Sequence, residues 1–586
     1  MKSTPTFRLS IVGIIMSLIG ALLLLQVIRI QTSAATNDVA NHSGAKNTAV
    51  NLTLDSKRGD ILDSSGHLLA GSKTVYEIGV DLGNMINKQA IATALQSITG
   101  IDSNTVLARI NDGLTNPNYV YIRLTDFIDP AKEAEIMDVK KKFQADGSNA
   151  LAGLMATPHL QRTYPDDTLA SNVLGFYSYL DTDAGRGYFG VEENYNEYLA
   201  GIKQVYKYAR DPYQINPMPT DTSGADLILT IDRQVQAAME QLVNKAIKST
   251  GAKSATIVVA NPKTGEILAM VSTPQFNPND YLSYGTVFAN NLPFNRAIGA
   301  TYEPGSVFKV LTMAAALDSG AVTPDTTFTD TGSIVIGGIR IYNWDRAAYG
   351  LQTMTGCLQH SLNVCLTWVA EQLGTTRFYD YLQAFGIGHR TNVDLEGEAN
   401  YPLTLPGDSN WYTVNLGTNS FGQGLSVTPI QMIQAVSAIA NLQGKMMAPH
   451  VLKAMVDKGR QYDNPPQVVG SPISAQTAKT ETEMLATSLE KEASVALVPG
   501  YRVAGKTGTG EIPGPDGYVS GVTNASFVGW GPVDDPHFLI YVWLEKPTSS
   551  IWGSVVAAPI FSEAFSTIAA LTHLPPDAAR QKLYGQ

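Results

Sequence analysis

An uncharged apolar run near the N-terminus, Leu9 to Ile28, constrains the fold of this chain more than any other feature. As an α-helix, its roughly 20 residues measure about 30 Å, the thickness of the hydrocarbon core of a bilayer. Lys2 and Arg8 precede the run, and positive residues stay on the cytoplasmic side. We therefore expect a cytoplasmic tail over 1–8, a single transmembrane helix over 9–30, and every later residue outside the cytoplasm.

A cleaved signal peptide is the alternative, because the small residues Ser33, Ala34 and Ala35 follow the run. The run is long for the apolar core of a signal peptide, and Gln26 and Arg29 come before the small residues, so we favour an uncleaved anchor. No other run in the sequence looks long enough to span a bilayer, which predicts one crossing.

Small residues recur every four positions within the anchor, at Gly13, Ser17 and Ala21. At this spacing they share one face of a helix, which allows a second membrane helix to approach closely. The face is expected either to contact a membrane partner or to point at lipid.

The remaining chain is long enough for more than one domain, since it has 586 residues in all. Its net charge of -11 argues against a nucleic-acid-binding surface. Residues 31–48 are rich in Ala, Asn, Ser and Thr and are expected to form a linker. We expect a mixed first domain over 49–225, with a helix near 129–143, and a larger domain over 226–586.

The larger domain begins and ends with strand-like segments and is helical between them. After 226 come a strand, a helix with Asp232 as its N-cap, and a hairpin over 254–273. A helix is expected to end near Val495, strands follow over 501–545, and a last helix covers about 556–571. Strands from both ends with helices between them predict an α+β fold.

The stretch Gly500–Thr507 fits the phosphate-binding pattern G-x-x-x-x-G-K-[ST]. That pattern needs a helix starting at Lys506, but the following residues are rich in Gly and Pro, which disfavour a helix. Tyr501–Val503, inside the would-be loop, are expected to form a strand. We therefore predict no nucleotide site. The same stretch contains Lys-Thr-Gly, which also occurs at Lys263–Gly265 as part of a polar turn.

The pattern Ser-x-x-Lys occurs three times. Ser43–Lys46 lies in the expected linker, and Ser488–Lys491 lies in a charged helix whose face is expected to be solvated. Ser306–Lys309 differs, because Pro304-Gly305 precedes it and an apolar helix follows, ending near Gly320.

A helix start suits nucleophilic chemistry. Side chains at i and i+3 share a face, so the Lys309 amine is expected to reach the Ser306 hydroxyl. The partial positive charge of the helix N-terminus and burial both favour a neutral lysine, which can accept the proton of the serine. The free backbone N–H of Ser306 is expected to face an oxyanion.

Two further motifs complete the constellation. Ser-x-Asn occurs once in the sequence, at Ser361-Leu362-Asn363, and is expected in a loop between helices. Ser361 is expected to pass protons between Lys309, Lys506 and a leaving group, and the amide of Asn363 to hold a peptide carbonyl.

The last motif is Lys506-Thr507-Gly508-Thr509, on a predicted strand. The charge of Lys506 and the hydroxyls of Thr507 and Thr509 suit a terminal carboxylate. Gly508 is expected to let a substrate backbone approach closely, and the Thr509 N–H to complete an oxyanion hole.

In this order and setting the three motifs resemble those of penicillin-binding proteins, and nearly the whole chain is similar to the class B transpeptidases. The Ser-x-Asn form is closer to the division type than to the elongation type. No glycosyltransferase domain precedes residue 226, which argues against class A. Further resemblances are RGDILDSSGHLLA (58–70, with Ser64-Ser65 where Arg-Asn is usual), RTYPDDTLASNVLGF (162–176), GYFGVEENYNEYLAG (187–201) and FGQGLSVTPIQM (421–432).

The resemblance implies a pedestal domain followed by a transpeptidase domain, in which an antiparallel sheet with flanking helices adjoins a mainly helical subdomain. It implies that Ser306 attacks the penultimate D-alanine of a peptidoglycan stem peptide, that D-alanine leaves, and that a neighbouring amine completes a cross-link. It also implies acylation by β-lactams, no metal or organic cofactor, and a place in the bacterial cell membrane. The implied partners are a SEDS-type glycan polymerase and other division or elongation proteins.

Two rival functions share these motifs. A β-lactamase needs a deacylating base, and Glu396 with Asn400 has the Glu-x-x-x-Asn spacing of class A enzymes. The same stretch also resembles a structural segment of penicillin-binding proteins, with Glu398 as its glutamate. A non-catalytic penicillin sensor or scaffold is the other rival, although a sensor usually has cytoplasmic signalling parts.

Three residues around Ser361 have no assigned catalytic role. Cys357 and Cys365 flank the Ser-x-Asn motif, and they either form a disulfide outside the membrane or remain buried thiols that face apart. His360 neighbours Ser361, but adjacency in sequence does not make a catalytic triad, so we assign it no role.

Overall fold

The computed structural model describes residues 5–32, 49–54, 56–179, 185–202, 204–209, 222–492, 494–514 and 517–584. These residues form two compact units, one from 1–57 with 201–223 and the other from 58–200 with 224–586. The predicted linker over 31–48 and the motif Ser43–Lys46 lie almost wholly outside the described residues. The predicted domain boundary at 225 stays a prediction.

The first unit contains the predicted membrane helix. Helix α1 (Pro5–Thr32) has a mean hydropathy of 2.2 between Val12 and Arg29, and the part of the chain that the structure describes does not bury this segment. Strand β1 (Ala49–Leu54) pairs antiparallel with β8 (Gln204–Ala209). The apolar helix is therefore confirmed.

The expectation that no second stretch is long enough to span a bilayer was wrong. Residues Gly553–Leu571 also have the length and composition for a crossing, but half of them are buried. Phe561, Phe565 and Ile568 of this stretch are in the core of the second unit. This stretch is thus the apolar core helix of a folded domain.

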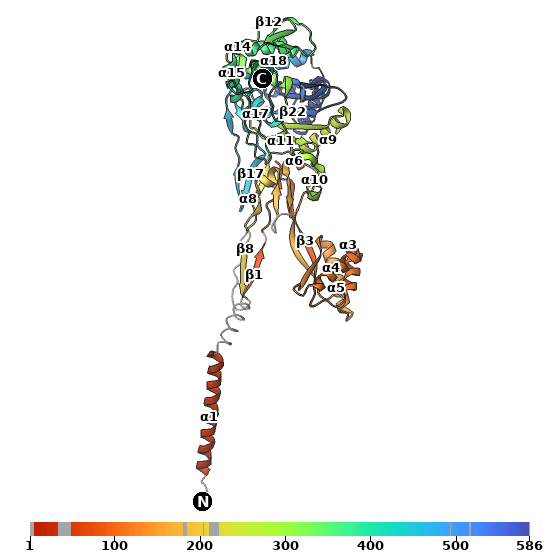
Figure 1. Ribbon diagram of the computed structural model, residues 1–586, viewed down its shortest axis with the longest axis vertical. Helices are drawn as coiled ribbons and strands as arrows, with labels where there is room; N and C mark the ends of the chain where they lie inside the picture. The colour runs from red at the N-terminus through yellow and green to blue at the C-terminus, as the bar shows by residue number, and fades with distance from the viewer. Residues whose placement is uncertain are drawn as a thin grey trace. The chain divides into compact units, whose positions relative to one another are not determined.

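The second unit contains two large sheets. The first has the strand order β18-β17-β9-β2-β3-β4, with β5 also paired to β3. Three helices pack against its β3–β4 end, as Figure 1 shows: α3 (Lys88–Thr99), α4 (Ser103–Thr115) and α5 (Pro130–Ala145). Helix α5 confirms the helix predicted near 129–143. The strands are β2 (Ile61–Leu62), β3 (Leu68–Asp81), β4 (Tyr121–Ile128), β5 (Leu154–Thr163), β9 (Asp226–Leu229), β17 (Leu452–Asp457) and β18 (Arg460–Asp463).

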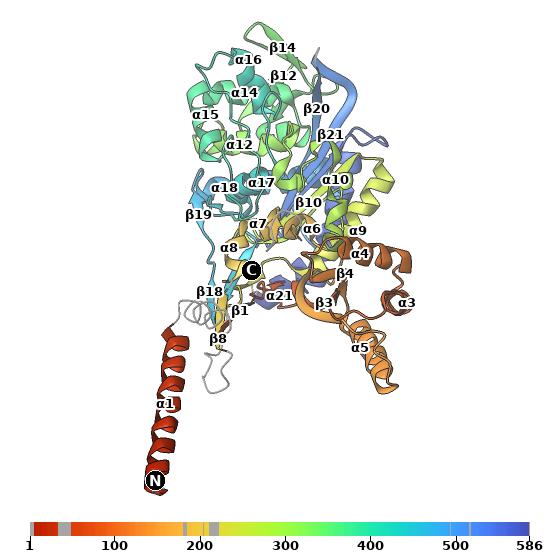
Figure 2. The same cartoon turned by 60° about the horizontal axis from the view of Figure 1, so that its bottom comes forward.

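The second sheet is antiparallel throughout, with the order β11-β10-β22-β21-β20. The predicted hairpin supplies two strands and the C-terminal part supplies three, so the α+β prediction is confirmed (Figure 2). Strand β20 lies at the edge of this sheet. The strands are β10 (Ser254–Ala260), β11 (Ile267–Ser272), β20 (Ala504–Gly514), β21 (Gly517–Gly531) and β22 (Phe538–Glu545).

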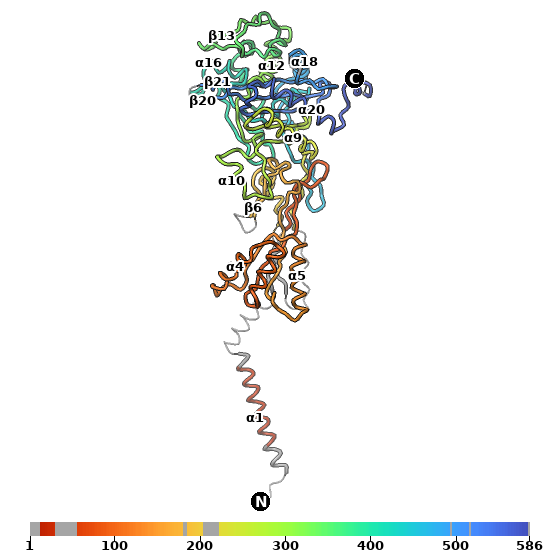
Figure 3. Tube along the Cα trace, turned by 90° about the vertical axis from the view of Figure 1, so that its right-hand side faces the viewer, coloured from red at the N-terminus to blue at the C-terminus, as the bar shows by residue number. Residues whose placement is uncertain are grey.

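Both faces of the second sheet are buried, because successive side chains of a strand point to opposite faces. On β10, Ile257 and Val259 pack in one core with helices α9 (Arg233–Thr250) and α20 (Ala558–Leu571). Val258 packs in another core with α12 (Lys309–Asp318), α14 (Asn363–Leu373) and α17 (Pro429–Ala440). Figure 3 shows α20 beside the C-terminal strands, and α9 packs against β10, β11 and α20. The N-cap prediction is confirmed: Asp232 accepts hydrogen bonds from the N–H groups of Gln234 and Val235.

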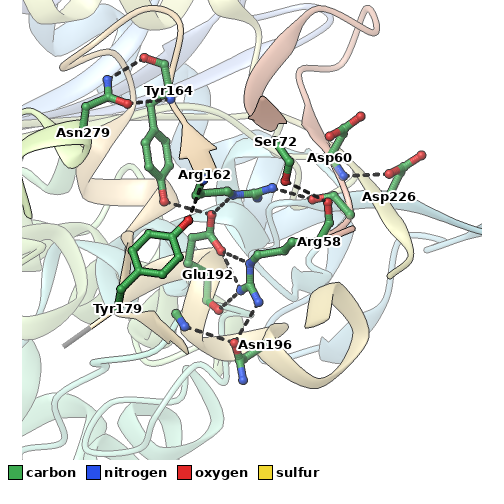
Figure 4. A network of polar contacts seen from close by, with 12 residues as sticks. Arg58, Asp60, Ser72, Arg162, Tyr164, Tyr179, Glu192, Asn196, Asp226 and Asn279 are labelled. Atoms are coloured by element: carbon green, nitrogen blue, oxygen red, sulfur yellow. Dashed lines mark hydrogen bonds and ion pairs between the residues drawn. The ribbon is translucent and has the colours of Figure 1, made fainter. Parts of the chain in front are cut away.

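A group of buried charges lies beside the first sheet (Figure 4). Glu192, on the short helix α7 (Gly190–Asn194), is fully buried and accepts hydrogen bonds from Arg58 Nε at 2.7 Å, Arg162 Nε at 2.6 Å and the Tyr164 hydroxyl at 3.0 Å. Both arginines are more than nine-tenths buried. One carboxylate thus neutralises two guanidinium groups from separate segments.

Two local predictions need correction. Helix α18 (Ala475–Glu492) confirms the helix expected to end near Val495, but the face that carries Ser488 is not solvated. Ser488 and Glu481 are buried, and the helix packs against α13 (Met354–Gln359) and β20. The Ser488 hydroxyl donates to the carbonyl of Met484. Tyr501–Val503 are not part of the strand, which begins at Ala504.

The physical reason for the late start of β20 is local. The Arg502 N–H donates to the carboxylate of Asp577, and the carbonyl of Arg502 accepts from Val533. These contacts take the place of strand pairing. Asp577 begins a further helix, α21 (Asp577–Tyr584), which the sequence pattern did not indicate.

Candidate active site

Three separate elements bring the predicted motifs to one cleft of about 700 Å³. Ser306 lies in the 3₁₀ turn η3 (Gly305–Phe308), and Lys309 begins α12. Ser361 lies between α13 (Met354–Gln359) and α14. Strand β20 carries the third motif. The helix start, interhelical loop and strand therefore have the predicted order, and the cleft is lined among others by Ser306, Ser361, Asn363, Thr507 and Thr509.

The turn that carries Ser306 packs tightly against β20 because glycines stand at the contact. Gly305 has φ of +60°, and a Cβ there would lie 2.5 Å from the Thr509 carbonyl oxygen. A Cβ on Gly508 would lie 2.8 Å from Val307 and 3.0 Å from the Pro304 carbonyl oxygen. Gly508 thus makes room for the chain's own turn, which differs from the predicted approach of a substrate backbone.

Lys309 is fully buried and hydrogen-bonds the Ser-x-Asn loop. Its Nζ donates to the Ser361 carbonyl oxygen at 2.6 Å, to Ser361 Oγ at 3.2 Å and to Asn363 Oδ1 at 2.8 Å. Among the described residues it makes no hydrogen bond to Ser306 Oγ. Burial and the charge of Lys506 hold the pKa of Lys309 well below its usual value, which favours the neutral amine.

Lys506 approaches the same hydroxyl from the strand. Its Nζ donates to Ser361 Oγ at 2.9 Å and to the Thr507 carbonyl oxygen at 3.2 Å. Burial lowers the pKa of Lys506 to about 7, although the charge of Glu492 acts in the opposite direction. Ser361 Oγ therefore lies between two buried amines, an arrangement that can carry a proton from one to the other.

Two further polar groups of the motifs already have partners within the chain. Asn363 Nδ2 donates to the Tyr342 carbonyl oxygen at 3.2 Å. The Thr509 hydroxyl accepts a hydrogen bond from the Gly553 N–H at 3.1 Å. An incoming ligand would therefore exchange these contacts for its own.

A disulfide joins the ends of the two helices that flank Ser361. Cys357 of α13 and Cys365 of α14 are bonded, with their Cα atoms 6.0 Å apart. Ser361 itself has φ of +54°, which is unfavourable for a residue with a side chain. The sequence left open either a disulfide or two buried thiols that face apart, and the structure contains the disulfide.

Removing this disulfide is expected to lower both the stability of the protein and the rate of the acylation by penicillin that the family resemblance implies. The loop that it closes spans eight residues, so Cys357→Ala with Cys365→Ala should cost about 2–3 kcal/mol through the unfolded chain. Without the disulfide, the loop is freer to change conformation, and Ser361 can relax from its unfavourable positive φ. Thermal unfolding and penicillin acylation rates test this; an unchanged acylation rate in a destabilised protein would mean that the disulfide does not hold Ser361.

Several cleft residues were not predicted. His360 lines the cleft, and its Nδ1 is in close contact with the carboxylate of Glu492, at the end of α18. The indole rings of Trp344 and Trp552 lie 5.1 Å apart and also line it. Glu511 lines it two positions after Thr509. Only Glu511 carried a sequence signal, because it continues the alternation of Thr507 and Thr509 along the strand.

The candidate base of a β-lactamase lies elsewhere. The described residues that line the cleft do not include Glu396, Glu398 or Asn400. The Glu398 carboxylate accepts hydrogen bonds from Thr391 N at 2.6 Å and from Asn392 N at 3.0 Å. It thus stabilises a local turn, as expected for a structural segment.

Comparisons with known proteins agree with this geometry. Residues 255–566 match the family described as "Penicillin binding protein transpeptidase domain", and residues 53–217 match "Penicillin-binding Protein dimerisation domain". Stage V sporulation protein D from Bacillus subtilis is 33% identical over 526 residues, which cover 87% of this chain and 77% of that protein.

Two further similarities come from a second curated protein and a solved structure. Peptidoglycan D,D-transpeptidase FtsI from Escherichia coli is 30% identical over 540 residues, covering 90% of this chain and 85% of that protein. Penicillin binding protein 3 from Mycobacterium tuberculosis, solved in complex with ampicillin, has a TM-score of 0.67 and 26% identity. That match covers 90% of this chain and 97% of the solved chain.

Proposed function

Because the chain belongs to the class B penicillin-binding proteins, we propose that it cross-links peptidoglycan stem peptides as a D,D-transpeptidase with Ser306 as its nucleophile. The family resemblance drawn from the sequence is confirmed, and division-type FtsI proteins are among the relatives. The observation that carries the assignment of residues is Ser361 Oγ between the buried amines of Lys309 and Lys506.

In the first step, Ser306 Oγ attacks the carbonyl carbon of the penultimate D-alanine while the neutral Lys309 amine takes the hydroxyl proton. The C–N bond to the terminal D-alanine then breaks, and the leaving nitrogen receives a proton through the Ser361 hydroxyl. Free D-alanine departs, and the rest of the peptide is held as an ester on Ser306.

In the second step, an amine of a neighbouring stem peptide attacks the ester carbonyl. The attacking amine loses a proton to Lys309 and Ser361, the groups that carried protons in the first step. The bond between the acyl carbon and Ser306 Oγ then breaks, and Ser306 Oγ takes up a proton. The N–H groups of Ser306 and Thr509 are the proposed oxyanion donors in both steps. Lys506, Thr507 and Thr509 are the proposed contacts of the terminal carboxylate.

β-Lactams fit the same scheme. Ser306 Oγ opens the four-membered ring and no leaving group departs, so the acyl-enzyme persists. The ampicillin complex of the Mycobacterium tuberculosis protein supports a penicillin site in this fold.

Intact mass after treatment with benzylpenicillin tests the proposal on the full-length protein in detergent. We expect a stable adduct of one drug molecule on the wild type and none on Ser306→Ala. Ser488→Ala is the matched control, because Ser488 has the same Ser-x-x-Lys spacing on α18, and it should be acylated like the wild type. Rapid return to unmodified protein would favour a β-lactamase, and a wild type without any adduct would favour a sensor or scaffold.

Acylation is expected to fall as the pH rises above about 7, because the pKa of Lys506 is lowered to about 7. Above this pH, Lys506 loses the positive charge that attracts the carboxylate of the drug. A penicillin methyl ester has no carboxylate, so its acylation rate should lack this alkaline fall. Rate constants measured from pH 6 to pH 9 provide the test, and equal alkaline falls for acid and ester would contradict the role of Lys506.

We further propose that α1 anchors the protein in the bacterial cell membrane with the cleft on the outer side. Lys2 and Arg8 support this orientation. The Cys357–Cys365 disulfide supports it independently, because structural disulfides form and persist in oxidising compartments outside the cytoplasm.

The face of Gly13, Ser17 and Ala21 is our proposed contact with a SEDS-type glycan polymerase. Leucine at Gly13 and Ala21 would block close approach of a second helix. We therefore expect the double substitution to abolish co-purification with the polymerase while the penicillin adduct still forms. Co-purification at the wild-type level would remove this proposal.

A further inference from the structure

The strand β20 presents alternate side chains to the cleft, as the pleat of a strand requires. Thr507, Thr509 and Glu511 all line the cleft, whereas the alternate residues Lys506, Gly508 and Gly510 are buried and are not among its lining residues. Glu511 therefore belongs to the same row of side chains as the two threonines. It lies two positions after Thr509, on the side away from Lys506.

The carboxylate of Glu511 is available to a ligand. Its side chain is exposed, its Oε2 accepts one hydrogen bond from Gln423 Nε2 at 3.1 Å, and its Oε1 has no partner among the described residues. The backbone of Glu303 lies close to this end of β20, because a Cβ on Gly510 would be 2.3 Å from the Glu303 carbonyl oxygen, and the Glu303 carboxylate accepts a hydrogen bond from the Tyr518 hydroxyl at 2.9 Å. Burial raises the pKa of Glu303, and the charge of Glu511 raises it further.

The direction of a bound donor peptide follows from the proposed function, on which this inference rests. The terminal carboxylate lies at Thr507, and the penultimate carbonyl lies between the N–H groups of Ser306 and Thr509. Continuing toward its own N-terminus, the peptide runs antiparallel to β20, past Gly510 and Glu511. Because β20 is the edge strand of its sheet, an extended peptide can lie along it.

We propose that Glu511 is a specificity-determining residue, which binds a primary ammonium group on the donor residue that precedes the two D-alanines. Two residues along a strand span about 7 Å, so a long amine-bearing side chain at that position reaches the Glu511 carboxylate. The donor is thereby selected for a positive charge next to its D-alanyl-D-alanine end.

Other charged cleft residues are less suited to this role. Glu492 lines the cleft too, but its carboxylate is paired with His360. Arg340 and Arg346 are cleft-lining cations, so they would repel an ammonium group. Glu511 is thus the cleft carboxylate without a basic side chain as its partner among the described residues.

A matched pair of donor peptides tests the proposal on the full-length protein in detergent. Nα-acetyl-L-lysyl-D-alanyl-D-alanine carries a free ε-ammonium group, and its Nα,Nε-diacetyl counterpart is neutral there. From release of D-alanine, the wild type should prefer the charged peptide in kcat/KM by about two- to fivefold, the scale of one exposed ion pair. Glu511→Gln should bring the ratio close to one, and Glu511→Lys should invert it.

The matched control is Glu492→Gln, which removes the other cleft carboxylate and should keep the preference. Loss of the preference in Glu492→Gln, or a wild-type ratio in Glu511→Gln, would overturn the proposal. Acylation by ampicillin, with an ammonium group beside its amide, relative to carbenicillin, with a carboxylate there, gives a second ratio that should shift in the same direction. A wild type that forms no adduct with benzylpenicillin would instead overturn the proposed function itself.

Discussion

Replacing Lys309 with methionine is expected to slow acylation by benzylpenicillin about 10³- to 10⁴-fold, the loss that follows removal of a general base. Methionine keeps the length and apolar character of the buried stem but has no basic nitrogen. The hydroxyl proton of Ser306 then has no nearby neutral amine to accept it. Stopped-flow or quench measurements of adduct formation by intact mass give the rate constant.

The matched control for this prediction is Lys491→Met. Lys491 has the same spacing from Ser488 that Lys309 has from Ser306, but it is exposed at the end of α18. The Lys491→Met variant should be acylated at the wild-type rate. A cooperative unfolding transition in Lys309→Met would show that the slow acylation is a chemical effect, and a rate within tenfold of the wild type would exclude Lys309 as the base.

The motifs of the cleft were predictable because each depends on a short segment. Pro304-Gly305 before an apolar run indicates a turn into a helix, and the Gly and Pro residues after Lys506 disfavour a helix. The structure places these segments as expected, in η3 with α12 and in β20. Local chemistry and order along the chain were sufficient.

Features that depend on tertiary packing could not be predicted in the same way. The disulfide requires Cys357 and Cys365 to face each other across a loop in which Ser361 adopts a positive φ, and no residue type signals that conformation. Glu481 looked solvated because its helix is rich in charge, yet it is fully buried on a helix that packs against other elements. Burial of a helix face is decided by its neighbours.

The charges beside the first sheet illustrate the same limit of local patterns. Arg58 and Arg162 are 134 and 30 residues from Glu192 in the chain, so their meeting follows only from the fold. Once the fold is known, elementary electrostatics predicts how much these charges contribute to stability, because charges removed from water are tolerated only when they are paired.

Glu192→Gln is accordingly expected to destabilise the protein by about 3–5 kcal/mol, since it leaves two buried guanidinium groups without a counter-charge. Glutamine keeps the shape of the side chain, so the loss reports the charge. Glu483→Gln is the matched control: Glu483 also pairs with an arginine, Arg502, but its side chain is 59% exposed, so the cost should stay below about 1 kcal/mol. Denaturant and thermal unfolding at pH 7 measure both losses.

The pH dependence of this loss separates charge from packing. Burial alone would raise the pKa of Glu192, but the charges of Arg162 and Arg58 outweigh it, and the pKa is lowered below the ordinary value of 4.5. A lowered carboxyl pKa stabilises the fold above the unfolded pKa, and that contribution is lost as the pH falls through the folded pKa. The difference between wild type and Glu192→Gln should therefore be largest at neutral pH and shrink progressively below about pH 4.5. A difference that is the same at pH 7 and pH 3 would mean that Glu192 acts through packing rather than charge.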